Sequence, residues 1–168
     1  MIVIMSAVIG HAEQLAGRLR KADLREIEAA AGEEPLAVLT NGIACSDPCY
    51  TVSDGCHPLA IFGVVPDACI EGVGRIWFLG ADDLRNHSFT FIRHSRRWVA
   101  RLHERYPVLW NYIDARNDLH IRWLRWCGFT LLRRIEDYGV ARLPFYEFER
   151  DAGGHGGVTC CAVVTGAS

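Results

Sequence analysis

The chain has 168 residues, of which 50% are hydrophobic and 23% charged, so it has enough apolar material for one compact domain with its own core. Its mean hydropathy is slightly positive, which argues against a wholly disordered chain. No apolar run reaches the roughly 18 residues that a membrane-spanning helix needs, so no membrane partner is expected. The seven cysteines are odd in number and unevenly spaced, which favours a reducing compartment over a disulfide framework.

The formal net charge is −2, but the charges are unevenly distributed. Residues 85–134 hold 11 arginines, no lysine and three acids, a balance of +8, whereas the remainder holds 7 basic and 17 acidic residues, a balance of −10. One part of the domain should therefore present a basic face. Such a face could bind a phosphate-bearing ligand, nucleic acid or an acidic protein surface. Alternatively, the arginines have no binding role and only form the solvated side of two helices.

The first half of the chain predicts an opening strand, two short helices within residues 11–31, and three further strands. Asp23 and Glu26 have the spacing of a capping box, with Asp23 as the N-cap of the second helix, and Gly32 is expected to follow that helix. The runs at 48–54, 58–65 and 75–81 are predicted strands. The last two are almost wholly apolar, which is typical of strands covered on both faces.

The second half predicts a helix at 89–106, a strand at 108–115, a helix at 117–127 and a closing hairpin of two strands. In the helix at 89–106, the inner face should be formed by Phe91, Ile92, Trp98, Val99 and Leu102, and the outer face carries Arg93, Arg97, Arg101 and Arg105 at intervals of four. Asn117 is the expected N-cap of the next helix and Gly128 its stop.

The element order β, α, α, β, β, β, α, β, α, β, β predicts an α/β (α+β) fold with a mixed sheet and helices on both faces. The predicted domain covers residues 1–150, and a glycine-rich linker at 151–157 joins it to an extended tail at 158–168. The tail is strand-forming and apolar. Its residues Val158, Cys160, Cys161 and Val163 are expected to dock on a partner by strand addition or as an extended clamp, and the alternative is a tail packed back on its own domain.

A resemblance to a known family is carried by four stretches of the chain, "LAGRLRKADLREIEAAAG", "PLAIFGVVP", "RYPVLWNYIDARNDLHIRWLRWCGF" and "LPFYEFE". They resemble the GNAT-like proteins of tailed bacteriophages, related to internal virion protein A of short-tailed phages, over about residues 12–150. The resemblance implies a GNAT N-acyltransferase fold with a mostly antiparallel sheet. It also implies a virion structural or assembly role, in the virion and in the host cytoplasm during assembly. The implied partners are portal, adaptor, tail or internal proteins, and a homo-oligomer is left open.

The chemistry of that fold is expected to be lost here. The resemblance implies that active members hold the pyrophosphate of acetyl-CoA in a glycine-rich loop and use a tyrosine seven residues after the cap asparagine as the general acid. The matching loop, "GADDLRNHSFTF", has one glycine and two acids, Asp82 and Asp83, which repel an anion. The tyrosine position is occupied by Leu124. We therefore expect a non-enzymatic protein with no cofactor.

Two alternatives stay open. If the acetyltransferase chemistry survives, the cofactor is acetyl-CoA, His120 and Tyr138 are the catalytic candidates, and Ser88, Arg93 and Asn117 are the cofactor-binding candidates. A nucleic-acid packaging or ejection factor would use the arginines, but no aromatic residues interleave with them. In the leading hypothesis Arg97 and Arg101 bind a partner protein together with the tail. A zinc site formed by Cys45, Cys49, Cys56 and His57 has irregular spacing, so no metal is expected.

Overall fold

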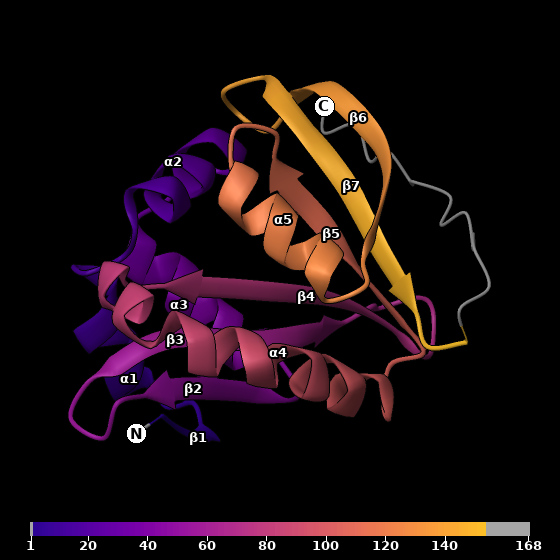
Figure 1. Cartoon of the computed structure of the whole chain (residues 1–168). Coiled ribbons are helices and arrows are strands. Elements are labelled where there is room, and N and C mark those ends of the chain that lie inside the picture. The colour runs from indigo at the N-terminus through magenta and orange to yellow at the C-terminus, as the bar shows by residue number, and fades with distance from the viewer. Residues whose placement is uncertain (1, 154–168) are drawn as a thin grey trace.

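The computed structural model describes residues 2–153, which form a single sheet of seven strands with helices on both faces (Figure 1). The elements are β1 (Val3–Ser6), α1 (Ile9–Ala16), α2 (Lys21–Ala30), α3 (Pro35–Cys45), β2 (Cys49–Ser53), β3 (Pro58–Pro66), β4 (Val73–Gly80), the 3-10 helix η1 (Asp82–His87), α4 (Ser88–His103), β5 (Val108–Asp114), α5 (Asp118–Trp126), β6 (Thr130–Tyr138) and β7 (Leu143–Asp151). The predicted tail and most of the predicted linker lie outside the described residues.

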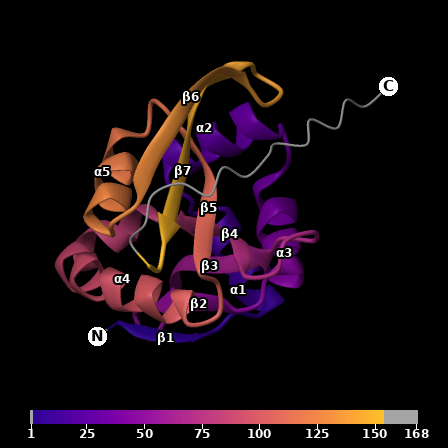
Figure 2. The ribbon, with the colours of Figure 1, turned by 90° about the vertical axis from the view of Figure 1, so that its right-hand side faces the viewer.

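The strands are ordered β1-β2-β3-β4-β5-β7-β6, and every neighbouring pair is antiparallel except β4 with β5. Figure 2 shows the layers: α4 and α5 cover one face of the sheet, and α1, α2 and α3 lie on the other. Each layer has its own apolar core. Val99, Leu102, Ile121 and Leu124 pack on one face, and Leu15 and Leu39 pack on the other. The predicted fold class is confirmed. Within the described part of the chain, no helix is long and apolar enough to cross a membrane.

The helix α3 has no counterpart among the predicted elements. Pro35 occupies its first turn, where a missing backbone N–H is harmless, but Gly42 in its middle lowers the helix propensity. The glycine is explained by a distant strand: a Cβ at position 42 would lie 2.7 Å from the ring of Trp77 on β4. The close approach of α3 to the sheet is therefore a tertiary requirement, which local propensity does not reveal.

The predicted capping box of α2 is wrong. The helix begins at Lys21, so Asp23 lies within the first turn and its side chain makes no cap hydrogen bond. The Asp23 side chain is instead almost completely buried, and its carboxylate accepts hydrogen bonds from the Arg20 guanidinium, at 2.7 and 3.0 Å, and from the backbone N–H of Gly80, at 2.8 Å. Asp23 thus fastens α2 to the end of β4.

Most of the predicted inner face of α4 is confirmed. Val99 and Leu102 are buried, and Phe91 and Trp98 are partly buried against the same core. Ile92 is an exception, because 41% of it is exposed. Its place is at the flank of α4 rather than on the inner face.

Gly139 fixes the β6–β7 turn against α2. Its φ is +69°, and a Cβ there would lie 2.4 Å from the carbonyl oxygen of Ala29. We expect Gly139→Ala to lower the free energy of unfolding by about 2 kcal/mol, because it combines backbone strain with a clash against backbone atoms. Denaturant unfolding measures this. The control is Gly55→Ala, which also has positive φ (+101°) but has open space at its Cβ, and an equal effect of both variants would contradict the clash.

Candidate functional site

The parallel strands β4 and β5 separate in the middle of the sheet. They pair only at Val73 with Val108, Gly74 with Leu109, and Arg75 with Trp110. Beyond this point the Asn111 side chain spans the gap, since its Nδ2 donates to the carbonyl oxygen of Ile76 at 2.7 Å. The separation leaves an opening in the sheet, and a binding site can form there.

A cavity of about 690 Å³ lies at this opening. Most of its lining is apolar, and it is bounded by residues from both faces of the sheet. Its polar and aromatic lining residues include Glu26, Arg75, Asn111, Tyr112, His120 and Tyr138. The volume is within the range of small-ligand sites.

Glu26 is the most perturbed acid of this cavity. Burial, with the nearby Asp23 and Asp114 carboxylates, raises the pKa of Glu26 to about 8, although a hydrogen bond from the Asn117 Nδ2 at 3.2 Å opposes the rise. Glu26 is therefore mostly protonated at neutral pH. Asn117 also caps α5, since its Oδ1 accepts from the His120 N–H at 3.3 Å. One side chain thus links α5 to the cavity acid.

The two catalytic candidates, His120 and Tyr138, both line the cavity. Burial and the nearby Arg20 lower the pKa of His120 to about 3, so the imidazole is neutral at physiological pH and a weak base. Its Nδ1 is buried and has no hydrogen-bond partner among the described residues. Burial raises the pKa of Tyr138, whose ring lies 4.6 Å from both the Tyr112 and the Phe145 rings. Neither group is tuned towards proton transfer near pH 7.

Aromatic side chains line the helical side of the opening. The rings of Phe78 on β4, Phe91 on α4 and Trp123 on α5 lie 5.3 to 5.8 Å from one another, and the His120 ring lies 5.3 Å from Trp123. Leu124, at the position of the family's tyrosine, is buried in the core next to this cluster. These side chains also line the cavity, so the cavity extends between β4, α4 and α5.

The loop between β4 and α4 does not fit a pyrophosphate. Such a group needs free backbone N–H groups, but four of those in this loop are engaged within the protein. The N–H groups of Gly80, Ala81, Leu84 and Ser88 donate respectively to Asp23, Leu59, Ala81 and Arg85. Asp83 also pairs with Arg18 at 2.6 Å, which holds a negative charge in this loop. The loop therefore differs from the glycine-rich loop that the resemblance implies.

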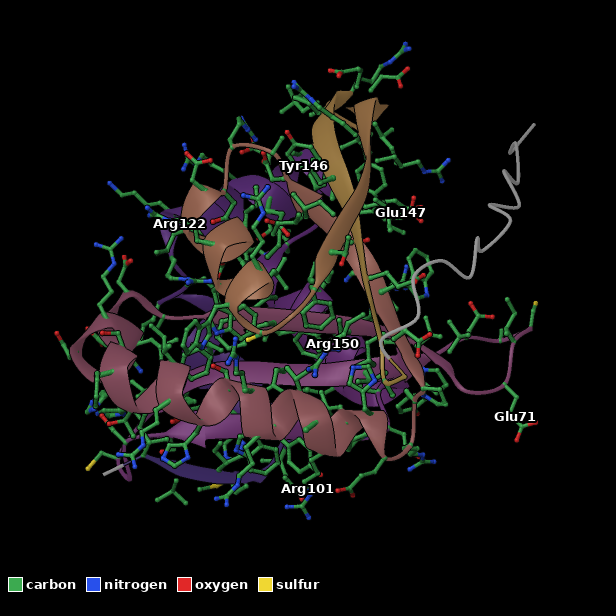
Figure 3. The ribbon with its side chains drawn as sticks, turned by 45° about the vertical axis from the view of Figure 1, so that its right-hand side comes forward. Glu71, Arg101, Arg122, Tyr146, Glu147 and Arg150 are labelled. Carbon is green, nitrogen blue, oxygen red and sulfur yellow. The ribbon has the colours of Figure 1, made fainter. Side chains whose placement is uncertain are left out.

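The three cofactor-binding candidates are dispersed. Ser88 is exposed at the start of α4, Arg93 is exposed on the outer side of that helix, and Asn117 is buried and committed to its cap and to Glu26. None of the three lines the cavity. The partner-binding candidates Arg97 and Arg101 are exposed on α4, and Figure 3 shows Arg101 pointing away from the sheet. Val158, Cys160, Cys161 and Val163 lie outside the described residues.

Glu26 was missed as a site residue by sequence reasoning, which placed it in a capping box. Its partner Asn117 is 91 residues away in the chain, and no local pattern connects the two. The cysteine cluster forms no site either: within residues 2–153, no three His, Cys, Asp or Glu side chains are grouped closely enough to hold a metal ion.

Comparison with known sequences gives one partial match. No protein-family model matches the chain. The chain is similar to the Probable scaffold protein gp13 of Escherichia phage T7, with 33% identity over 84 residues. This match covers 48% of the chain and 56% of the phage protein, so the chain spans about half the length of that relative.

Comparison with solved structures identifies the fold. The ribosomal-protein-S18-alanine N-acetyltransferase of Escherichia coli superposes with a TM-score of 0.65 at 12% identity, over 95% of this chain and 98% of the enzyme. The spermidine N-acetyltransferase of Vibrio cholerae, solved with CoA and spermine, gives 0.67 at 10% identity, over 90% and 96%. A GNAT-family acetyltransferase of Streptococcus pneumoniae gives 0.60 at 13%, over 90% and 99%. The chain therefore has the GNAT fold, and likeness at this identity concerns the fold alone.

Proposed function

We propose that the chain is a phage structural or assembly protein, in which a GNAT-like domain without acyltransferase activity binds other virion proteins. The observation that carries the proposal is the loop between β4 and α4, where engaged backbone amides and the acids Asp82 and Asp83 oppose a cofactor pyrophosphate. The partial similarity to a phage scaffold protein supports the assembly role. Portal, adaptor, tail or internal proteins are the partner classes that this role implies, in the virion or at its site of assembly.

The decisive measurement is calorimetric titration of the full chain with acetyl-CoA. We expect no saturable binding, because Asp83 and the occupied amides oppose a pyrophosphate. Saturable binding that is lost in Arg93→Ala and kept in the control Arg142→Ala would contradict the proposal. Arg142 suits the control because it is exposed at the distant β6–β7 turn.

The assembly role has its own test in the phage whose genome carries the gene. We expect disruption of the gene to leave particles that are incomplete or not infectious, and we expect the chain to be found in assembly intermediates. Normal yields of infectious particles without the gene would contradict the role.

The second candidate is an acetyl-CoA-dependent N-acyltransferase, and the cavity favours it. Glu26 has a pKa of about 8 within a 690 Å³ space at the strand opening, and a carboxylate of raised pKa is a suitable general base for an amine. In this reading Glu26→Gln would abolish turnover. Acetyl transfer from acetyl-CoA to an amine, dependent on Glu26, would establish the enzyme in place of the structural protein.

A further inference from the structure

The outer side of α4 and α5 carries a mixed basic and apolar surface. The arginine surface consists of Phe89, Ile92, Arg93, Arg96 and Arg97 on α4 and Trp126 on α5. Phe89 is 80% exposed and Trp126 is 48% exposed. Hydrating large apolar side chains is unfavourable. An exposed apolar patch therefore often marks an interaction site.

The arginines of this surface have no acidic partner among the described residues. The seven ion pairs of the described chain involve Arg18, Arg20, Arg105, Arg116, Arg133, Arg134 and Arg142, and none involves Arg93, Arg96 or Arg97. Arg96 is held in place by Trp126: its Nε donates to the Trp126 carbonyl oxygen at 2.7 Å, and its guanidinium lies 4.1 Å from the centre of the indole ring. Arginine beside exposed aromatic rings is the composition of energetically dominant interface residues.

A surface of opposite charge lies on the other face of the sheet. The acidic surface consists of Glu28, Glu33, Glu34 and the apolar residues Leu36 and Val140, all of them exposed, with Val140 at 66%. The β6–β7 turn brings Val140 to this surface, because the N–H groups of Val140 and Ala141 donate to the carbonyl oxygens of Ala30 and Ala29 at the end of α2, at 3.3 and 3.1 Å. None of the three glutamates takes part in an ion pair of the described chain.

We propose that the arginine surface of one copy binds the acidic surface of a second copy, so that the chain associates head to tail. The charges are complementary, with three arginines on one surface against three glutamates on the other, and each surface pairs its charges with exposed apolar side chains. Because α4 and α5 lie on the opposite side of the sheet from α2 and α3 (Figure 2), the two surfaces of one copy cannot bind each other. A contact between two unlike surfaces then continues from copy to copy, into a ring or an open assembly.

The observations favour a protein occupant over nucleic acid. A phosphate backbone would pair with the three arginines, but it offers no apolar surface for Phe89 and Ile92, and it would leave the acidic surface without a role. A second copy satisfies both surfaces. Electrostatic contacts of this kind weaken as salt is added.

The test is sedimentation velocity of the full chain over a range of concentrations. We expect sedimentation coefficients that rise with concentration and fall when salt is added. Arg93→Glu should weaken the association by about tenfold or more, because it places like charges opposite each other, and Glu33→Arg should do the same from the other side. The matched controls are Lys21→Glu at the start of α2, and Glu71→Arg at the far tip of the β3–β4 loop (Figure 3).

A mixture of the two variants separates this mode from symmetric pairing. Each variant keeps one intact surface, so Arg93→Glu and Glu33→Arg should associate more strongly when mixed than either variant does alone. A chain that stays monomeric at all concentrations overturns the proposal, as does a dimer that Glu33→Arg leaves unchanged. Monomers that bind duplex DNA through Arg93 would also overturn it and assign the arginine surface to nucleic acid. These outcomes do not depend on acetyl-CoA binding, so failure here leaves the proposed function standing.

Discussion

Asp23→Ala is expected to lower the free energy of unfolding by about 4 kcal/mol, which is the usual range for removing one partner of a buried ion pair. Asp23 is 2% exposed, and its carboxylate accepts hydrogen bonds from both Arg20 and the Gly80 N–H. Burial raises the pKa of Asp23 while Arg20 opposes the rise. Removing the side chain leaves the largely buried Arg20 guanidinium without its acidic partner and the buried Gly80 N–H without an acceptor. Urea unfolding, monitored by circular dichroism, measures the difference.

Two variants show whether the loss arises from this network. Asp23→Asn keeps an acceptor for the Gly80 N–H but loses the charge opposite Arg20. Its free energy of unfolding should therefore lie between those of the wild type and Asp23→Ala. Asp82→Ala removes an exposed carboxylate from η1 and should have little effect. If Asp23→Ala proved no more destabilising than Asp82→Ala, α2 would not depend on this bond for its attachment to β4.

The stability of the folded chain is expected to fall as the pH rises from about 4.5 to about 8, with Glu26 as the cause. Burial raises the pKa of Glu26 from 4.5 to about 8, so over this range the folded state keeps a proton that the unfolded state has released. The stabilisation is complete below the unfolded pKa and is lost as the pH passes through the folded one, at up to about 1.4 kcal/mol per pH unit. Urea unfolding at a series of pH values measures the slope.

Glu26→Gln is the matched variant, because its amide oxygen still accepts from Asn117 but does not titrate. We expect its unfolding free energy to change less with pH than that of the wild type, and to be the higher of the two at pH 8 and above. Glu28→Gln, on the exposed side of α2, should leave the slope unchanged. Parallel curves for wild type and Glu26→Gln would show that this carboxyl has an ordinary pKa.

The sequence by itself determined the elements whose apolar periodicity is strong. The strands at 58–65 and 75–81, the closing hairpin, and the helices carrying Val99 and Leu124 all lie close to their predicted places, because a repeat of two or of 3.6 residues directly selects strand or helix. Asn117 was predicted as the N-cap of α5 and is that cap, since a cap depends only on neighbours three residues away. The uneven distribution of basic and acidic residues was also evident from the sequence.

Only the tertiary structure decided what the polar residues of α2 do. Asp23 and Glu26 look like a local capping pair, but their partners Gly80 and Asn117 are 57 and 91 residues distant. The helix α3 depends on Trp77, for which Gly42 makes room. The cavity exists because β4 and β5 separate after three paired residues. Burial and long-range hydrogen bonds set these features, and neither is encoded by the spacing of residues within one element.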